Sequence, residues 1–296
     1  MTLLPKLGWA SVAISVAVLG LKFAAYAMTG SIALYSDALE CIINVVAALA
    51  GVLALSVSAR PADANHPYGH YKAEYLSAVV EGVLVLLTAF AIAHQAWQGW
   101  QHPHAPRVPL QGIGFNAAGG VLNGIWATVL IRVGRARRSP ALTAGGQHVL
   151  SDVWTSAGLL LGFALVPLTG WLRLDSVLAG LVALNILRVG FELVRHSIGG
   201  LMDEVADPAA VEEIRRVIAE NASGAIEAHD VRTRSVGSMT FIEFHLVVPG
   251  QMAVQTAHEI CDRIEVALRQ SLGDAVINIH VEPEQKAKHK GVVVLP

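Results

Sequence analysis

Two pairs of polar residues stand within long apolar stretches of the sequence, and the members of each pair are four positions apart. The first pair is Glu40 and Asn44, and the second is His148 and Asp152. A spacing of four places both side chains of a pair on one face of a helix. Together the pairs offer one imidazole nitrogen and three oxygen donors, a set that suits a tetrahedral divalent transition-metal ion, above all Zn²⁺. They therefore predict a metal site shared by two helices.

The sequence around the two pairs is repeated. Ser31 begins the motif S-x-A-L nine residues before Glu40, and Ser139 begins the same motif nine residues before His148. Related halves around a central site are common in membrane transporters, and ionisable groups inside apolar helices are costly unless they face a partner or a cavity. The alternative is that these polar residues only join the helices through hydrogen bonds.

A second candidate site lies between the second and third apolar segments. Asp63, His66 and His70 fall within eight residues, so their side chains can converge on one ion. In the alternative interpretation they are solvated loop residues. Further along, Glu81 stands inside the third apolar segment. A polar pathway, a dimer contact and a hydrogen-bonded structural role are all open interpretations of this glutamate.

The C-terminal part of the chain contains a third set of residues of metal-ligating types. Two of them, His280 and Glu282, share one face of a predicted strand because strand side chains alternate. By spacing alone the set is not a cluster, since it is spread over four segments. Its members are His229, His245, His258, His280 and Glu282.

The composition separates a membrane part from a soluble part. Of the 296 residues, 54% are hydrophobic and only 15% are charged, whereas soluble domains are nearer ~25% charged. Charged residues are sparse from Leu7 to about Gly200 and frequent after Met202. Six apolar segments reach the roughly 20 residues that a membrane helix needs. They are Leu7–Met28, Ile32–Val57, Tyr75–Trp97, Leu110–Val133, Ala141–Leu165 and Leu174–Leu193.

Both ends of the chain are expected on the cytoplasmic side. Six spans return the chain to the side on which it starts, and most basic residues near the span ends, among them Arg135, Arg137 and Arg138, lie on that side. Basic residues mark the cytoplasmic side of membrane proteins. We therefore predict a multi-pass protein of an inner or plasma membrane, with residues 1–200 as its all-α, six-helix transmembrane transport domain.

After the last apolar segment, the periodicity predicts a cytoplasmic domain at residues 203–284, followed by a flexible tail at residues 285–296. Helical and alternating apolar spacings follow one another in the order αββαβ, and Gly237–Ser238 supply the turn of a hairpin. This order is typical of a ferredoxin-like α+β domain. The predicted elements are a helix at Pro208–Glu220, strands at Ile226–Ser235 and Thr240–Val248, a helix at Ala253–Leu272 and a strand at Ala275–Val281.

The sequence also excludes several classes of function. A formal net charge of −2 with no run of Lys or Arg predicts no nucleic-acid partner. The sequence has no phosphate loop, nucleotide motif or nucleophile elbow, so we expect neither an enzyme nor ATP coupling, and no prosthetic group. Cys41 and Cys261 lie in different predicted domains and form no disulfide framework.

Five stretches of the sequence, taken in order, resemble the cation diffusion facilitator family of proton-coupled metal exporters. They are SIALYSDALECIINVVAAL, RPADANHPYGHYKAE, SPALTAGGQHVLSDVWTSAGLLLG, SIGGLMDE and HDVRTRSVGSMTFIEFHLVV. The resemblance covers essentially the whole chain. It implies a homodimer in which each protomer joins six transmembrane helices to a cytoplasmic ferredoxin-like domain.

The resemblance also implies roles for the candidate residues. It matches the two membrane pairs with the transport site of the family, the loop residues with a further metal site, and the whole C-terminal set with a binuclear site near the dimer interface. It pairs Lys72 with Asp203 at the junction of the two domains. The chain departs from the family pattern at Asn44, where bacterial zinc and iron exporters usually have aspartate, and at Glu282, where the family often has aspartate.

Together, the residues and the resemblance predict an antiporter that exports a divalent metal ion from the cytoplasm in exchange for protons, by alternating access. The ligand types favour Zn²⁺, and Fe²⁺, Co²⁺, Ni²⁺, Mn²⁺ and Cd²⁺ are the other candidates. The expected partners are a second copy of the chain, the lipid membrane and protons. The alternative function is a membrane-anchored metal sensor that signals through its soluble domain.

Overall fold

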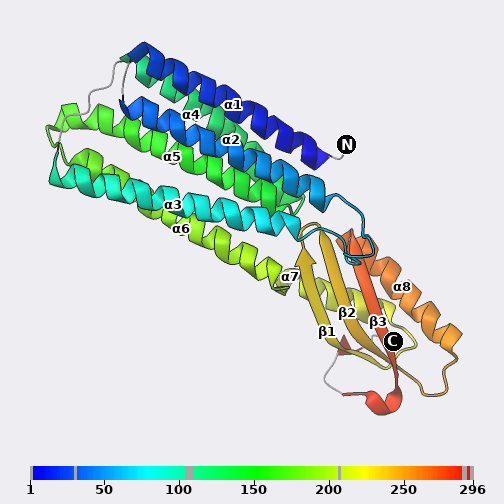
Figure 1. Ribbon diagram of the computed structural model, residues 1–296. Coiled ribbons are helices and arrows are strands. Elements are labelled where there is room, and N and C mark those ends of the chain that lie inside the picture. Colours follow the sequence, from blue (N-terminus) through cyan, green and yellow to red (C-terminus); the bar gives the residue numbers. More distant parts are fainter. Residues whose placement is uncertain (1–2, 30–31, 104–109, 206–207, 289–291, 294–296) are drawn as a thin grey trace. The chain divides into compact units, whose positions relative to one another are not determined.

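The long apolar segments of the sequence form long helices. The computed structural model describes residues 3–29, 32–103, 110–205, 208–288 and 292–293. It divides into two compact units, residues 1–198 and 199–296. The first unit is built from six helices (Figure 1), as the sequence predicts. They are α1 Leu3–Thr29, α2 Ile32–Ser58, α3 Ala73–Gln101, α4 Leu110–Ala136, α5 Pro140–Thr169 and α6 Leu174–Leu201.

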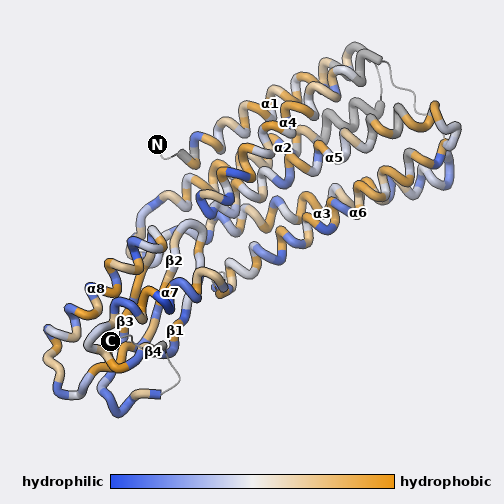
Figure 2. Tube along the Cα trace, turned by 180° about the vertical axis from the view of Figure 1, so that it is seen from behind, coloured by the Kyte–Doolittle hydropathy of each residue, from blue (hydrophilic) through white to orange (hydrophobic). Residues whose placement is uncertain are grey.

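The lengths and surfaces of these helices suit a membrane. A helix of 27 residues, such as α1 or α2, is about 40 Å long, which exceeds the ~30 Å of a bilayer core. Large apolar side chains such as Leu87, Phe90 and Leu184 are exposed on them, and Figure 2 shows hydrophobic residues along their length. Within the described residues, four stretches are long and apolar enough to cross a membrane: Lys6–Ala24, Ala73–Gln101, Gly114–Ala136 and Ser176–Leu201.

Close helix packing positions α5, which carries the second polar pair. Helices α1, α2, α4 and α5 pack against one another, and α3 packs against α2 and α5. Helix α6 lies along α3 (Figure 1), where Ile186 packs with Val85. A Cβ atom at Gly146 of α5 would lie 2.7 Å from Cγ1 of Ile131 in α4. Only glycine permits this approach, so the α4–α5 contact depends on a small residue, as is common between membrane helices.

A buried carboxylate ties the start of α5 to α2 and α3. The Ser139 side chain caps α5 at the backbone N–H of Leu142, 3.4 Å away, and Pro140 stands in the first turn. The Ser139 hydroxyl donates to Glu74 of α3, which also accepts from the Ser58 hydroxyl of α2 at 2.8 Å. Because Glu74 is buried, these hydrogen bonds satisfy it and hold three helix ends together.

The second unit has the order αββαβ, so the expected ferredoxin-like class is confirmed. Strand β1 pairs antiparallel with β2, β2 pairs parallel with β3, and a short β4 pairs with β1, in the order β3-β2-β1-β4. The parallel pair needs a crossover, which α8 supplies. The elements are α7 Pro208–Asn221, β1 Glu227–Val236, β2 Met239–Val248, α8 Val254–Leu272, β3 Ala275–Pro283, the short 3-10 helix η1 Glu284–Lys286 and β4 Val292–Val293.

The two helices of this unit cover one face of the sheet. Strand β2 sends Ile242 and Leu246 into a fully buried core with Ile218 of α7 and Ile264 of α8. Since strand side chains alternate, His245 points to the opposite face. The apolar alternation of the strands therefore decides which face of the sheet carries the histidines.

The segment 285–296, which the sequence predicts to be a flexible tail, contains ordered parts. Val292 of β4 pairs with Ala228 of β1. The backbone N–H of Lys288 donates to Glu227 at 2.7 Å, and its ammonium group pairs with Asp230 at 2.6 Å. The pairing of β4 with the edge of β1 and the contacts of Lys288 with two β1 side chains thus hold the described residues of the segment against the sheet, and the expectation of a flexible tail stays a prediction. Hydrogen bonds of this kind produce no periodic spacing of apolar residues, so the sequence pattern does not predict them.

Candidate metal sites

In the first unit, Asn44 stands between His148 and Asp152. Its Nδ2 donates to Oδ2 of Asp152 at 2.5 Å, and its Oδ1 lies 2.8 Å from Nε2 of His148. Helix α2 presents Asn44, and α5 presents the other two residues one turn apart. Three of the four predicted transport-site residues thus form one hydrogen-bonded chain. Glu40 lies in α2 four residues before Asn44, but its side chain is outside the described residues, so its participation stays a prediction.

The hydrogen bonds fix the direction of this chain. A carboxylate only accepts, so the amide nitrogen of Asn44 faces Asp152 and the amide oxygen faces His148. His148 therefore donates from Nε2, and its Nδ1 carries the lone pair. This Nδ1 is buried and makes no hydrogen bond within the described residues. A buried nitrogen lone pair of this kind can accept a proton or bind a metal ion.

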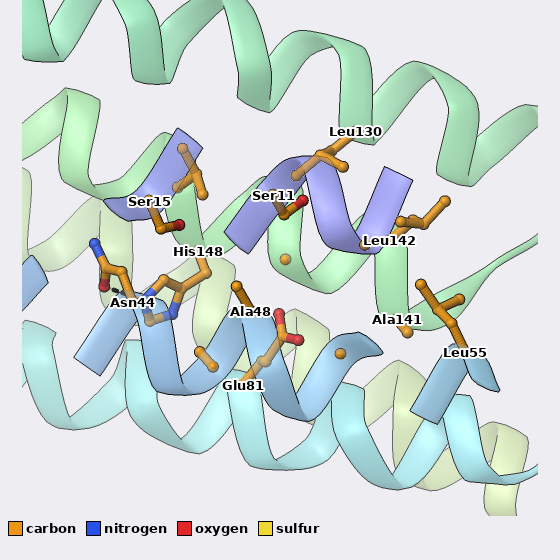
Figure 3. Close-up of a pocket in the computed structure, with 15 residues that line it drawn as sticks. Ser11, Ser15, Asn44, Ala48, Leu55, Glu81, Leu130, Ala141, Leu142 and His148 are labelled. Carbon is orange, nitrogen blue, oxygen red and sulfur yellow. Dashed lines mark hydrogen bonds between the residues drawn. The ribbon is translucent and has the colours of Figure 1, made fainter. Parts of the chain in front are cut away.

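A cavity opens beside the chain, between helices α1 to α5. Its volume is about 40 Å³, which exceeds the ~10–15 Å³ that one water molecule requires. Asn44 and His148 form one part of its wall, Glu81 of α3 forms another, and Ser11 and Ser15 of α1 add hydroxyl groups (Figure 3). Hydrogen bonds that merely join helices need no cavity, so this opening favours a site for a cation. The rest of the wall is Gly8, Ala47, Ala48, Gly51, Leu55, Leu130, Ala141, Leu142, Gly145 and Val149.

In the loop between α2 and α3, Asp63 lies between two histidines. Its Oδ1 is 3.3 Å from Nδ1 of His66, and its Oδ2 is 3.4 Å from Nε2 of His70. The candidate ligand atoms of the three residues lie within 4.8 Å of one another. Gly69 turns the chain between the histidines with a φ of 83°, and a Cβ there would lie 2.8 Å from the Tyr71 ring. The loop thus brings the three predicted residues together.

Backbone hydrogen bonds prepare the Asp63 carboxylate. The backbone N–H groups of His66 and Asn65 donate to its Oδ1 at 2.8 and 2.9 Å. These bonds, with that of His66 as the largest cause, hold the pKa of Asp63 below its ordinary value. The carboxylate is therefore ionised and oriented toward the two histidines.

In the second unit, three histidines stand in a row across neighbouring strands. His229 of β1 is opposite His245 of β2, which is opposite His280 of β3. Adjacent rings in the row are 5.2 and 5.0 Å apart. Glu282 lies 3.3 Å from Nε2 of His229, 3.3 Å from Nδ1 of His245 and 3.8 Å from Nε2 of His280. Strand register thus gathers four members of a set that spacing alone could not join.

His258, the fifth member of that set, lies apart from the row. Its side chain on α8 is 75% exposed, and its Nε2 is 3.7 Å from Asp262. Helix α8 covers the face of the sheet opposite to the histidines. Among the described contacts of a single chain, none joins His258 to the other four residues, so its assignment to the same site stays a prediction.

Two carboxylates that the sequence analysis missed belong to this cluster. Glu227 is buried, and its Oε1 lies 3.0 Å from Nδ1 of His229. A carboxylate that holds one ring nitrogen leaves the other for a metal ion. Asp230 has a φ of 53° beside a β-bulge, and its carboxylate lies within 4.8 Å of ligand atoms of His229 and His245. Glu227 could have been predicted from the sequence, because it lies two residues before His229 and therefore on the same face of the strand. Asp230 could not, because the β-bulge beside it leaves no signal in the sequence.

The predicted pair of Lys72 and Asp203 joins residues of different units. The two units are described separately, so this pair stays a prediction. Within the second unit, Asp203 accepts a hydrogen bond from Nη1 of Arg234 at 3.1 Å and has a φ of 59°. No local sequence pattern predicts this contact, because the two residues are far apart along the chain.

Long apolar helices, a chain of metal-ligating side chains on a cavity between them, and a ferredoxin-like domain with a histidine cluster together define a metal-transporting membrane protein. Residues 8–202 match the family model of the cation efflux transmembrane domain, and residues 206–284 match that of the cytoplasmic domain of cation efflux proteins. The protein therefore belongs to the cation diffusion facilitator family of metal efflux transporters, and it is a transporter, not an enzyme. The match of the cytoplasmic domain indicates dimerisation.

Similar proteins span nearly the whole chain. An uncharacterized transporter of Synechocystis sp. is 38% identical over 94% of this chain and 90% of its own length. The cation-efflux pump FieF of Shewanella oneidensis is 28% identical over 93% of both chains. The family resemblance inferred from the sequence motifs is thus confirmed.

Two solved structures match one part of the chain. A Zn form of the transporter CzrB is 46% identical and covers 29% of this chain and 98% of its own, with a TM-score of 0.28. The metal-bound C-terminal domain of the CzcD transporter from Thermotoga maritima is 28% identical and covers 28% of this chain and 100% of its own, with a TM-score of 0.26.

Proposed function

We propose that this protein exports a divalent transition-metal ion, with Zn²⁺ as the first candidate, from the cytoplasm in exchange for protons by alternating access. The observation that carries the proposal is the hydrogen-bonded chain of His148, Asn44 and Asp152, whose first two members line a cavity inside the membrane unit. Nitrogen and oxygen donors of these types are those that Zn²⁺ and neighbouring metals accept. Glu40 is the fourth ligand in this proposal.

Asn44 acts as a neutral bridge between the two other described ligands. Its amide holds Asp152 and His148 in place by hydrogen bonds. An arriving divalent ion is a stronger partner for the carboxylate and the imidazole, and the amide oxygen of Asn44 can then turn to the ion as a neutral donor. The site is in this way ordered before the ion binds and needs only a local rearrangement to accept it.

Protons compete with the metal ion for the same atoms. A ligand imidazole must be neutral and a ligand carboxylate must be ionised, so the affinity for the metal falls as the pH falls. Protonation of His148 from the outer side would therefore repel the ion and release it, and the protonated site would return to the cytoplasmic side.

The cytoplasmic parts of the chain would sense the metal. The cluster around His229, His245 and Glu282 has the donor types for a binuclear site, and ions bound there would draw the two soluble domains of a homodimer together. The Asp63 loop site would bind a further ion, and Lys72 with Asp203 would join the domains. We propose a multi-pass topology in an inner or plasma membrane, with both termini in the cytoplasm.

Uptake of Zn²⁺ into liposomes that contain the purified protein tests the proposal. With an acidic lumen and a Zn²⁺-sensitive dye inside, uptake should rise with the pH difference and stop when a protonophore removes it. Asp152→Ala should lower the flux by more than ~100-fold, because losing even an outer-shell partner of a metal ligand costs about 10–100-fold in affinity. The matched control is Glu192→Gln on α6, an exposed carboxylate paired with Arg188. It should leave the flux unchanged.

The outcomes separate the parts of the proposal. Uptake that ignores the pH difference would refute the proton coupling, and normal uptake by Asp152→Ala would refute the site. Zn²⁺ binding without flux would instead favour the metal sensor. The same assay with Fe²⁺, Co²⁺, Ni²⁺, Mn²⁺ and Cd²⁺ ranks the transported metals.

A further inference from the structure

Glu81 is a titratable residue on the cavity wall that the proposed transport site does not use. It lies on α3 and is 2% exposed. Its Oε2 is buried and makes no hydrogen bond within the described residues, and no described cation pairs with the carboxyl group. A glutamate in such a position is costly in a membrane helix and usually serves a function.

Two glycines make room for this carboxyl group between α2 and α5. A Cβ atom at Gly51 of α2 would lie 3.6 Å from Oε1 of Glu81, and one at Gly145 of α5 would lie 3.3 Å from Oε2. Gly51 is about two turns beyond Asn44 on α2, and Gly145 is about one turn before His148 on α5. The carboxyl group therefore lies between α2 and α5, the two helices that carry the hydrogen-bonded ligand chain.

The same cavity reaches Glu81 and the ligand chain. Glu81 and His148 both line it, and the hydroxyl groups of Ser11 and Ser15 stand across it on α1 (Figure 3). Its volume of about 40 Å³ admits water. Water and hydroxyl groups can bridge polar groups that are too far apart for a direct hydrogen bond. Water in this cavity, together with the two serine hydroxyl groups, would give a proton a route between Glu81 and the metal site.

A proton is the only cation that Glu81 suits. A transition-metal ion takes about four ligands, whereas the carboxyl group stands against two glycines and an otherwise largely apolar wall. A buried carboxylate without a cationic partner is unfavourable, so the group is neutral while the metal site is empty. A divalent ion at the metal site favours the ionised form by Coulomb attraction across the same low-dielectric space.

We propose that Glu81 is a proton-carrying residue of the transport cycle, a role that rests on the proposed exchange of metal for protons. The carboxyl group holds a proton while the membrane site is empty. When a divalent ion arrives from the cytoplasm, the O–H bond of Glu81 breaks and the proton leaves to the cytoplasmic side. A new O–H bond forms with a proton from the outer side after the ion has left. Each cycle thus moves one proton in addition to those that the ligands exchange.

The other titratable groups around α3 cannot take this role. Among the described residues that line the cavity, His148 of α5 is the only other titratable one, while α1, α2 and α4 contribute hydroxyl, amide and apolar groups. On α3 itself, Glu74 is already held by Ser58 and Ser139. Helix α6 packs on α3 beside Gly82 through apolar side chains. Its ionisable side chains that the structure describes are exposed: Arg188, Glu192, Arg195 and His196.

The test counts the protons exchanged for each metal ion. Potassium and valinomycin hold the liposomes at zero voltage. At each of several pH differences, we measure the ratio of inner to outer Zn²⁺ concentration at which the net flux stops. The slope of the logarithm of this ratio against the pH difference equals the proton number. Glu81→Gln should lower the slope by about one. The ratio of Zn²⁺ concentrations across the membrane that a difference of one pH unit can sustain then falls about tenfold. The variant should still form the dimer and transport Zn²⁺.

Two control variants separate proton carriage from packing. Glu81→Asp keeps a carboxyl group and should keep the wild-type slope, and so should Glu74→Gln, a buried carboxyl variant on the same helix. A lowered slope in Glu81→Asp would indicate a packing effect and overturn the inference. If Glu81→Gln does not fold, Glu81→Ala supplies the same comparison.

The slopes also separate this inference from the proposed function. A wild-type slope of zero would refute the metal–proton exchange itself, and with it the role of Glu81. A positive wild-type slope that Glu81→Gln leaves unchanged would overturn the role of Glu81 alone.

Discussion

An aspartate at position 44 would set two carboxylates against each other in the empty membrane site. Nδ2 of Asn44 lies 2.5 Å from Oδ2 of Asp152, and Asn44→Asp would place an oxygen in its position. Two unit charges 4 Å apart repel by about 4 kcal/mol at an effective dielectric constant of about 20, and these oxygens would be closer. Since each ~1.4 kcal/mol is tenfold in an equilibrium constant, the repulsion amounts to about a thousandfold. Before a metal ion binds, the site of the variant should therefore hold an additional proton at acid pH and lose it at alkaline pH.

Metal binding to the Asn44→Asp site must displace that proton. The logarithm of the apparent affinity should therefore rise with pH more steeply than in the wild type, by about one unit for each pH unit. At alkaline pH the added negative charge favours the ion, so the variant should bind Zn²⁺ more tightly. At acid pH the competing proton removes this advantage. The measurement is the Zn²⁺ concentration at half-maximal initial uptake into liposomes, taken from about pH 6 to about pH 8.5, across the imidazole range.

Asn123→Asp is the matched control for this experiment. Asn123 is a buried asparagine of α4, and it does not line the cavity. The same chemical change there should leave the half-saturating Zn²⁺ concentration and its pH dependence as in the wild type. If Asn44→Asp also behaved like the wild type, residue 44 would not belong to a site that binds both the metal ion and protons, and the reasoning from the hydrogen-bonded chain would fail.

Two further predictions concern the sites outside the membrane. Glu227→Gln weakens the hydrogen bond that orients His229, so the Zn²⁺ affinity of the cytoplasmic cluster, measured by calorimetry on the full-length protein, should fall about 10–100-fold. The control Glu243→Gln changes an exposed glutamate of β2 and should leave this affinity unchanged. Equal losses of affinity in the two variants would contradict the orienting role of Glu227. The loop site should not lose metal through protonation of Asp63 at weakly acid pH, because the hydrogen bond from the backbone N–H of His66 lowers the pKa of Asp63 and its carboxylate stays ionised there. Asp63→Asn should abolish binding to the loop at every pH, and a loss that follows carboxylate protonation would refute this assignment.

The sequence alone determined the elements of this protein and the helices that carry its membrane site. Runs of apolar residues predict membrane helices because the bilayer leaves the backbone few alternatives, and alternating residues around Gly237–Ser238 predict the hairpin that the structure contains. The spacing of Asn44 from Glu40 and of His148 from Asp152 predicts which residues share a helix face. All these features depend on neighbours along the chain, so periodicity records them.

Only the tertiary structure decided how residues distant along the chain meet. Strand register lines up His229, His245 and His280, and it leaves His258 on the other side of the sheet. The bridge of Asn44 depends on the distance between α2 and α5. The place of Glu81 depends on two glycines of neighbouring helices, and strand β4 is held by the edge of β1. Contacts of this kind arise from packing between elements. Local patterns in the sequence do not contain the distances and directions between those elements.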